Sequence, residues 1–301
     1  MRPSRKIVRQ FLQGNIITFA ASFKLEAYPH HPTLRALVLI LYLSTAITAQ
    51  GAFERTAQPI SVVGTAQAAL FNGEYSSVLL NPSAAGLLGA SALSVFYSPS
   101  PFGLSQLSTC GLVAVSPIGP VGGAFSATTT GFSLYRELVL SATVARSFEG
   151  TASVGANLRL NYLAIERFGS TTVPAADLAA MIQATDEVKV GLSVLNLLRG
   201  RIAGARDELP VTCIFGISWQ LLTSACFSLA FFKEEDFPES FRTSVQFSPM
   251  EVVRISVGLS TEPSRFCGGV SFRIAPFWFE YAIVSHDVLG LSHSLGISFC
   301  L

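Results

Sequence analysis

The last ten residues, Ser292 to Leu301, read S-H-S-L-G-I-S-F-C-L, and this stretch determines how the whole chain is interpreted. In an extended chain, successive side chains point to opposite faces. One face of this stretch is therefore apolar, with Leu295, Ile297, Phe299 and Leu301. The opposite face carries serine and glycine. The alternation predicts a β-strand with one apolar face and one face of small, mostly polar residues.

Composition extends this interpretation to the rest of the chain. Half of the residues (50%) are hydrophobic, only 13% are charged, and the mean hydropathy is +0.49. Soluble domains carry about 25% charged residues, so the low charge argues against a soluble β-sandwich with its polar faces in water. After Gln50, no run of 18 apolar residues occurs, so membrane-spanning helices are not predicted. The chain is very apolar overall, but polar residues interrupt its apolar stretches at alternate positions. This pattern favours strands with one face toward lipid and one face toward the lumen.

From Ser91 onward the chain divides into fourteen segments of strand length, several of which alternate cleanly, and an even number is typical of single-chain bacterial barrels. We predict an all-β fold, a transmembrane antiparallel β-barrel of about 14 strands in residues 91–301, located in the bacterial outer membrane. Residues 174–184 fit a short helix equally well on propensity. The predicted strands are Ser91–Tyr97, Leu107–Ser116, Gly122–Ser133, Leu138–Phe148, Ala152–Ile165, Pro174–Ala184, Val188–Leu198, Val211–Leu221, Ala225–Lys233, Ser240–Phe247, Val252–Ser260, Phe266–Ile274, Phe277–Ser285 and Ser292–Cys300.

Residues 1–49 are interpreted as a signal peptide. Arg35 precedes the apolar stretch 36–43, and small residues follow up to a cleavage site predicted after Ala49. Residues 1–33 are long for the leading part of a signal peptide, so a start codon assigned too far upstream is the preferred explanation. Cleavage removes six of the 20 Lys+Arg and one of the 19 Asp+Glu, which leaves 14 basic and 18 acidic residues and a formal charge of −4. This balance gives no reason to expect a nucleic-acid partner.

The predicted lumen face is lined by small residues and carries few charges. Small residues allow another part of the chain to approach the wall closely, and residues 50–90, before the first strand, are the obvious candidate for such a plug. The lumen-facing glycines are Gly155, Gly191, Gly216, Gly258, Gly269 and Gly296. The lumen-facing charges are Arg159, Lys189, Arg254, Arg273 and Glu280.

The stretch Gly64 to Leu88 carries a family resemblance. Its Gly/Ala-rich start, acidic Ser/Ala-rich step and closing Asn-Pro-(Ser-Ala)-Ala-Gly-Leu resemble the N-terminal region of the FadL-like outer-membrane barrels, especially the PorV/PorQ family. Ala176-Asp177-Leu178 and Glu280-Tyr281-Ala282 are similar to later strands of that family. Asn81, Pro82 and Gly86 hold the matching positions, and proline and asparagine are turn formers. We therefore predict that these three anchor the plug.

No catalytic, cofactor-binding or metal-binding constellation is present. After cleavage, His286 and His293 remain, without the partners of a triad. The five cysteines are scattered, which excludes a zinc motif and favours small buried hydrophobes, although an exported protein also permits a disulfide between neighbouring strands.

Two functions remain open. The first is passage of small apolar or amphipathic solutes across the outer membrane, which we rank first. The PorV/PorQ resemblance implies the alternative, an accessory protein of type IX secretion that binds or shuttles exported proteins at the cell surface. Both imply outer-membrane lipid and the barrel-assembly machinery as partners, with hydrophobic solutes or secretion-system proteins as the specific ones.

Overall fold

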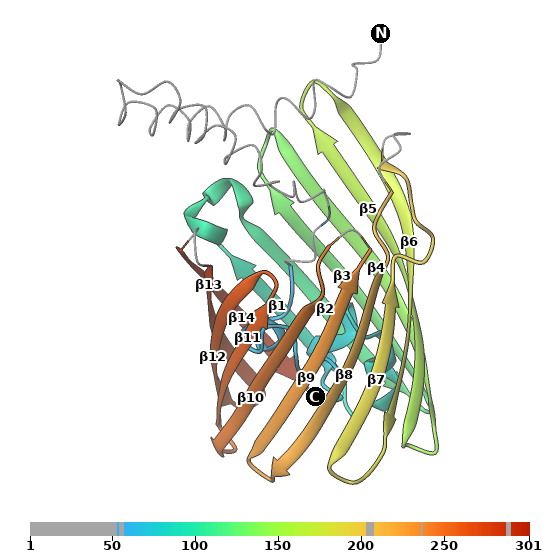
Figure 1. Ribbon diagram of the computed structural model, residues 1–301, viewed down its shortest axis with the longest axis vertical. Helices are drawn as coiled ribbons and strands as arrows, with labels where there is room; N and C mark the ends of the chain where they lie inside the picture. The colour runs from blue at the N-terminus through green and yellow to red at the C-terminus, as the bar shows by residue number, and fades with distance from the viewer. Residues whose placement is uncertain (1–52, 54–56, 203–207, 236, 287–289) are drawn as a thin grey trace, which may run out of the picture. The chain divides into compact units, whose positions relative to one another are not determined.

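A computed structural model describes Phe53 and residues 57–202, 208–235, 237–286 and 290–301. The predicted signal peptide lies outside the described residues. Fourteen antiparallel strands form one closed barrel, in which β1 pairs with both β2 and β14 (Figure 1). The strands are β1 (Ala92–Ser98), β2 (Thr109–Ile118), β3 (Val121–Gly131), β4 (Tyr135–Phe148), β5 (Ala152–Ile165), β6 (Gly169–Gln183), β7 (Val188–Leu195), β8 (Thr212–Leu222), β9 (Ala225–Glu234), β10 (Ser240–Met250), β11 (Val253–Thr261), β12 (Ser264–Ile274), β13 (Phe277–His286) and β14 (Gly290–Cys300).

All fourteen predicted strands are present, and only their ends differ. The largest difference is in β6, which begins at Gly169, five residues before the predicted start at Pro174. Only residues 178–183 of β6 pair with β7, so Pro174 lies where β6 has a partner strand on one side alone. A proline is tolerated at such an edge because no ladder hydrogen bond is needed there. The helical alternative for residues 174–184 is wrong.

Burial follows the predicted alternation. Ser298 is 0% exposed, whereas its neighbour Ile297 is 49% exposed, and the same pattern runs around the barrel. The outward residues are mostly large and apolar, and they remain exposed because they face lipid. A closed barrel satisfies its backbone hydrogen bonds internally and can therefore cross a membrane. The protein is an outer-membrane β-barrel.

No helix within the described ranges is long and apolar enough to cross a membrane.

The connections identify the two ends of the barrel. Ala92 and Cys300 pair with each other, so the barrel strands begin and finish at the same end. The turns at this end are short, for example residues 119–120 and 223–224, whereas the opposite end carries the long connections 99–108 and 196–211. Outer-membrane barrels have short periplasmic turns and longer extracellular loops. The end near Cys300 is therefore periplasmic.

The hairpin between β12 and β13 pairs its two strands residue by residue up to the turn. Phe272 lies opposite Phe279, and Arg273 lies opposite Trp278. Two residues make the turn, and the peptide bond from Ala275 to Pro276 is cis.

The cysteines differ from the expectation in two places. Cys110 and Cys213 are exposed on the outward face and are not small buried residues, while Cys267 is buried. None of the five forms a disulfide. The outward face requires only an apolar side chain, which a thiol provides without burial in protein.

Before β1, the chain runs inside the barrel as a segment that we call the N-terminal segment (residues 57–90). It contains the short helix α3 (Ile60–Gly64) and the 3₁₀ turns η1 (Tyr75–Leu79) and η2 (Pro82–Leu87), whereas η3 (Pro101–Gly103) and η4 (Ser105–Leu107) belong to the loop after β1. α3 contacts β11 to β14, and η2 contacts β2 to β6. Figure 1 shows the segment, in blue to cyan, among the strands. Leu70, Phe71 and Leu80 are fully buried, so the segment shares an apolar core with the wall.

Candidate functional site in the barrel lumen

All six glycines assigned to the lumen face contact the N-terminal segment. Phe71 lies between two of them: a Cβ atom would fall 2.0 Å from Phe71 Cδ1 if built on Gly191, and 2.5 Å from Phe71 Cδ2 if built on Gly216. No real Cβ atom tolerates such distances, so the wall fits the segment only because these side chains are missing. The other four approaches are Gly155 to Pro82, Gly258 to Thr65, Gly269 to Gly64, and Gly296 to Ile60.

The three predicted anchor residues lie at the start of η2 and along it. Asn81 is 0% exposed, and its Nδ2 atom donates a hydrogen bond to the carbonyl oxygen of Leu70 at 2.9 Å. Pro82 is the first residue of η2 and is buried. A Cβ atom on Gly86 would lie 2.3 Å from Ser153 Oγ, on β5. Asn81 thus joins two stretches of the segment, while Pro82 and Gly86 lie against the wall; their anchoring role remains a proposal.

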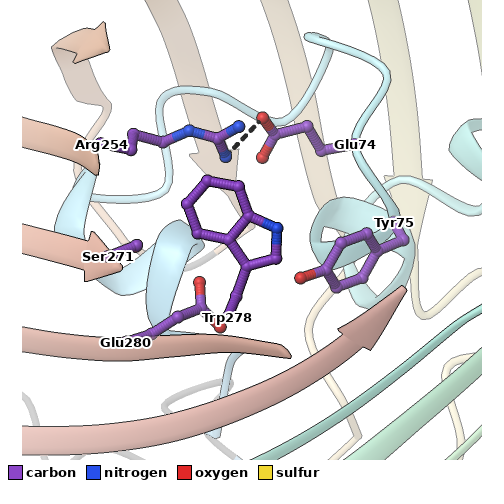
Figure 2. A pocket seen from close by; sticks show the side chains of 6 residues that line it. All are labelled: Glu74, Tyr75, Arg254, Ser271, Trp278 and Glu280. Atoms are coloured by element: carbon purple, nitrogen blue, oxygen red, sulfur yellow. Dashed lines mark ion pairs between the residues drawn. The ribbon is translucent and has the colours of Figure 1, made fainter. Parts of the chain in front are cut away.

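A hollow of about 110 Å³ lies between η1 and the wall formed by β11, β12 and β13. It is lined by Glu74, Tyr75, Arg254, Ser271, Trp278 and Glu280 (Figure 2). Arg254 and Trp278 are each the second residue of a strand that begins at the periplasmic end. The hollow therefore lies in the periplasmic part of the lumen, where the segment and the wall meet.

One ion pair joins the segment to the wall in this hollow. Arg254 Nη1 lies 2.8 Å from Glu74 Oε1, and both side chains are about three-tenths exposed (30% and 27%). The guanidinium carbon of Arg254 also lies 5.3 Å from the ring centroid of Trp278, and that of Arg273 lies 5.9 Å from it. Figure 2 shows the indole between the ion pair and Glu280. The indole of Trp278 thus makes cation–π contacts with two arginine side chains and presents an aromatic surface to the hollow.

Two further lining residues, Glu280 and Tyr75, carry ionisable groups. Ser298 donates a hydrogen bond to Glu280 Oε2 at 2.8 Å, which holds this carboxyl group against β14. Burial, and next the negative charge of Glu280, raise the pKa of the Tyr75 hydroxyl. Tyr75 therefore remains a neutral hydrogen-bond donor at any physiological pH. The hollow combines aromatic surface with fixed donors and acceptors, an arrangement that suits small amphipathic molecules.

The remaining predicted lumen charges have their own partners. Lys189 Nζ donates to the carbonyl oxygen of Asn72 at 2.8 Å, which is a second polar link between wall and segment. Arg159 makes a bidentate pair with the fully buried Asp177, at 2.8 and 3.0 Å. The backbone N–H of Asn196 donates to the same carboxylate at 2.8 Å. This cluster ties the start of the 196–211 connection to β6, just where β7 ceases to pair with it.

Sequence reasoning missed both acidic partners, Glu74 and Asp177. Asp177 was noted only as part of a family-like motif, although it shares the lumen face with Arg159 once β5 and β6 are paired. Glu74 stands in the segment, and nothing local indicates which strand it meets. Opposite charge on the lumen face was the available signal for Asp177, whereas the partner of Glu74 requires the path of the segment.

No protein-family model matches this chain, and no curated protein sequence matches it. Solved structures do match. A CymD monoaromatic hydrocarbon channel has a TM-score of 0.63 at 13% identity, over 83% of this chain and 99% of that one. A Pseudomonas aeruginosa FadL homologue has a TM-score of 0.53 at 12% identity, over 83% and 98%. A TodX monoaromatic hydrocarbon channel mutant, deltaS2, has a TM-score of 0.54 at 9% identity, over 75% and 94%. The chain shares the barrel fold of these three structures.

The described residues of this barrel contain no group of three His, Cys, Asp or Glu side chains that could hold a metal ion. The lumen site consists instead of one aromatic surface, one ion pair and a closely packed segment.

Proposed function

We propose that the protein conducts small apolar or amphipathic solutes across the outer membrane, and that the N-terminal segment is its gate. The observation that carries this proposal is the closely fitted segment inside the barrel, which leaves an aromatic-lined hollow beside it. The fold adds support, because CymD and TodX, which share it, are named as monoaromatic hydrocarbon channels.

The hollow is small in this conformation. It measures about 110 Å³, whereas an engineered cavity that binds benzene measures about 150 Å³. We therefore expect the segment to move when a solute of that size passes. Such movement separates Glu74 from Arg254, and a partly exposed ion pair of this kind contributes only about 0.2–1 kcal/mol. The close packing of the segment against the glycines of the wall opposes its displacement more strongly than this ion pair does.

Liposome swelling with small amphipathic solutes tests the proposal. The wild-type protein should give slow swelling, and Glu74→Gln should increase the rate about two- to fivefold, because loss of up to about 1 kcal/mol favours the displaced segment by that factor. Glu166→Gln, in the exposed turn between β5 and β6, is the matched control and should leave the rate unchanged. Absence of swelling with all three proteins would contradict a channel function.

The second candidate is the PorV/PorQ-type role in type IX secretion. It is supported by the resemblance of residues 64–88 and by a bore that the segment fills, since an adaptor needs no conduit. A pure adaptor predicts no solute flux from any of the variants above, together with co-isolation of the barrel with the secretion machinery. That pair of results would favour this role over conduction.

A further inference from the structure

A second hollow, of about 320 Å³, lies on the outside of the barrel at the ends of β1 to β4. It is lined by Tyr97, Ser108, Thr109, Cys110, Thr129, Gly131 and Arg136. Strand alternation places several of these side chains on the lipid face. Arg136 has the parity of the exposed Leu140, and Thr129 has that of the exposed Phe125. The hollow therefore opens toward the membrane and not toward the lumen.

We propose that this hollow binds the phosphate group of a membrane lipid in the outer leaflet. The depth of the hollow in the membrane supports this assignment. Arg136 and Arg146 share the outward face of β4 and are ten residues apart, which spans about 33 Å along a strand. With a strand tilt of about 40°, this corresponds to a height of about 25 Å, the thickness of the apolar belt of such barrels.

Only apolar side chains lie on this face between the two arginines: Leu138, Leu140, Ala142 and Val144. The two guanidinium groups therefore mark the two rims of the belt. Arg136 lies near the end of β4 that is opposite to the periplasmic turns, at the level of the outer-leaflet headgroups. A cation at this level meets lipid phosphates and not acyl chains.

The side chains that line the hollow also suit a phosphate group. Arg136 is exposed, and it takes part in none of the ion pairs or side-chain hydrogen bonds found among the described residues. Its planar guanidinium matches a phosphate in a two-point, charge-assisted contact. The hydroxyl group of Tyr97 lines the same hollow and can donate to a remaining phosphate oxygen, whereas that of Ser108 donates to the carbonyl oxygen of Gly131 at 3.5 Å.

Gly131 explains why a hollow exists beside this arginine. It pairs directly with Arg136 across the β3–β4 ladder. Its φ angle is +113°, and a Cβ atom there would lie 2.1 Å from the carbonyl oxygen of Tyr135. Backbone geometry thus keeps this position without a side chain. The space left is larger than a phosphate alone requires, so it accommodates part of the glycerol or sugar that carries the phosphate.

Native mass spectrometry of the full chain, purified in detergent, tests the proposal with three probes: phosphatidic acid, diacylglycerol with the same acyl chains, and inorganic phosphate. The wild-type protein should bind phosphatidic acid in preference to diacylglycerol. Arg136→Gln should weaken phosphatidic acid binding about tenfold or more, as expected for loss of a charge-assisted contact, and Tyr97→Phe should weaken it by a smaller factor. Retention of heat-modifiable migration on gels shows that each variant is folded.

Arg146→Gln is the matched control, because it removes an arginine from the same face of the same strand at the opposite rim. Arg146 lies over the ring of Phe148, 5.8 Å from its centroid, and does not line the hollow. Equal loss from Arg146→Gln would show that any outward arginine suffices, and would overturn the proposal. Equal binding of diacylglycerol, or full displacement by inorganic phosphate at the concentration of the lipid, would overturn it as well. None of these outcomes depends on solute conduction.

Discussion

Replacing Gly191 by alanine should loosen the N-terminal segment without harming the barrel. The new methyl group would lie 2.0 Å from Phe71 Cδ1, whereas carbon atoms in contact stay about 3.5–4.0 Å apart. The ring must therefore move by about 1.5–2 Å. Phe71 is 0% exposed and packs with Leu70, Leu80 and Ile214, so no empty space receives it.

Overpacking of this kind costs about 1–3 kcal/mol. Because the Cβ atom points into the lumen, this cost falls on the state in which the segment is seated and not on strand pairing. A cost of about 2 kcal/mol changes the ratio of displaced to seated segment about thirtyfold. We therefore expect a large increase in the swelling rate of liposomes that contain Gly191→Ala, with normal heat-modifiable migration.

Two further variants make the test specific. Gly123→Ala is the control, since Gly123 has only one neighbouring atom within 4 Å, at 4.0 Å. In a Phe71→Ala background, Gly191→Ala should add little, because the ring that the new methyl group meets is gone; contacting residues show such non-additivity. Equal leakage from Gly191→Ala and Gly123→Ala, or additive effects of Gly191→Ala and Phe71→Ala, would refute the reasoning.

Three other predictions concern the belt, the anchor and the buried ion pair. On β11, Val257→Arg, at the centre of the outward face, should destabilise the barrel by about 2–4 kcal/mol in a denaturant titration, and an arginine nearer the strand end should cost less. Asn81→Ala combined with Pro82→Ala should leave an assembled barrel with greater solute leak, and unchanged permeability would reduce the two residues to a structural turn. Asp177→Asn, which leaves the buried Arg159 without its carboxylate, should cost about 3–5 kcal/mol of unfolding free energy, and a thermal transition equal to that of the wild type would contradict this.

On the lumen face of β11, Ser256 lies against α3. It is buried, and its Oγ atom lies 2.6 Å from where a Cβ atom on Gly64 would be. Its neighbour Ile255 is exposed on the lipid face. An arginine in place of Ser256 would meet α3 and should therefore alter the bore.

The strands and their faces follow from local sequence pattern alone. Alternation has a period of two residues, and it depends only on the backbone and on which side faces lipid. The stretch from Ser292 to Leu301 was therefore sufficient to assign its lipid and lumen faces. The glycines of the lumen face also indicated close packing against the wall, because a missing side chain is visible in the sequence, whatever fills its place.

Which residues come into contact depends on the closed barrel and on the path of the segment inside it. Closure of the barrel brings β11 to β14 around the N-terminal segment, so Glu74 reaches Arg254 across 180 positions of chain, which no local pattern encodes. The early start of β6 depends on where β7 stops pairing, and the hollow beside Arg136 depends on the register between β3 and β4. Local periodicity sets the direction of each side chain, but pairing, closure and the path of the segment set its neighbours, and the chemistry of both hollows belongs to those neighbours.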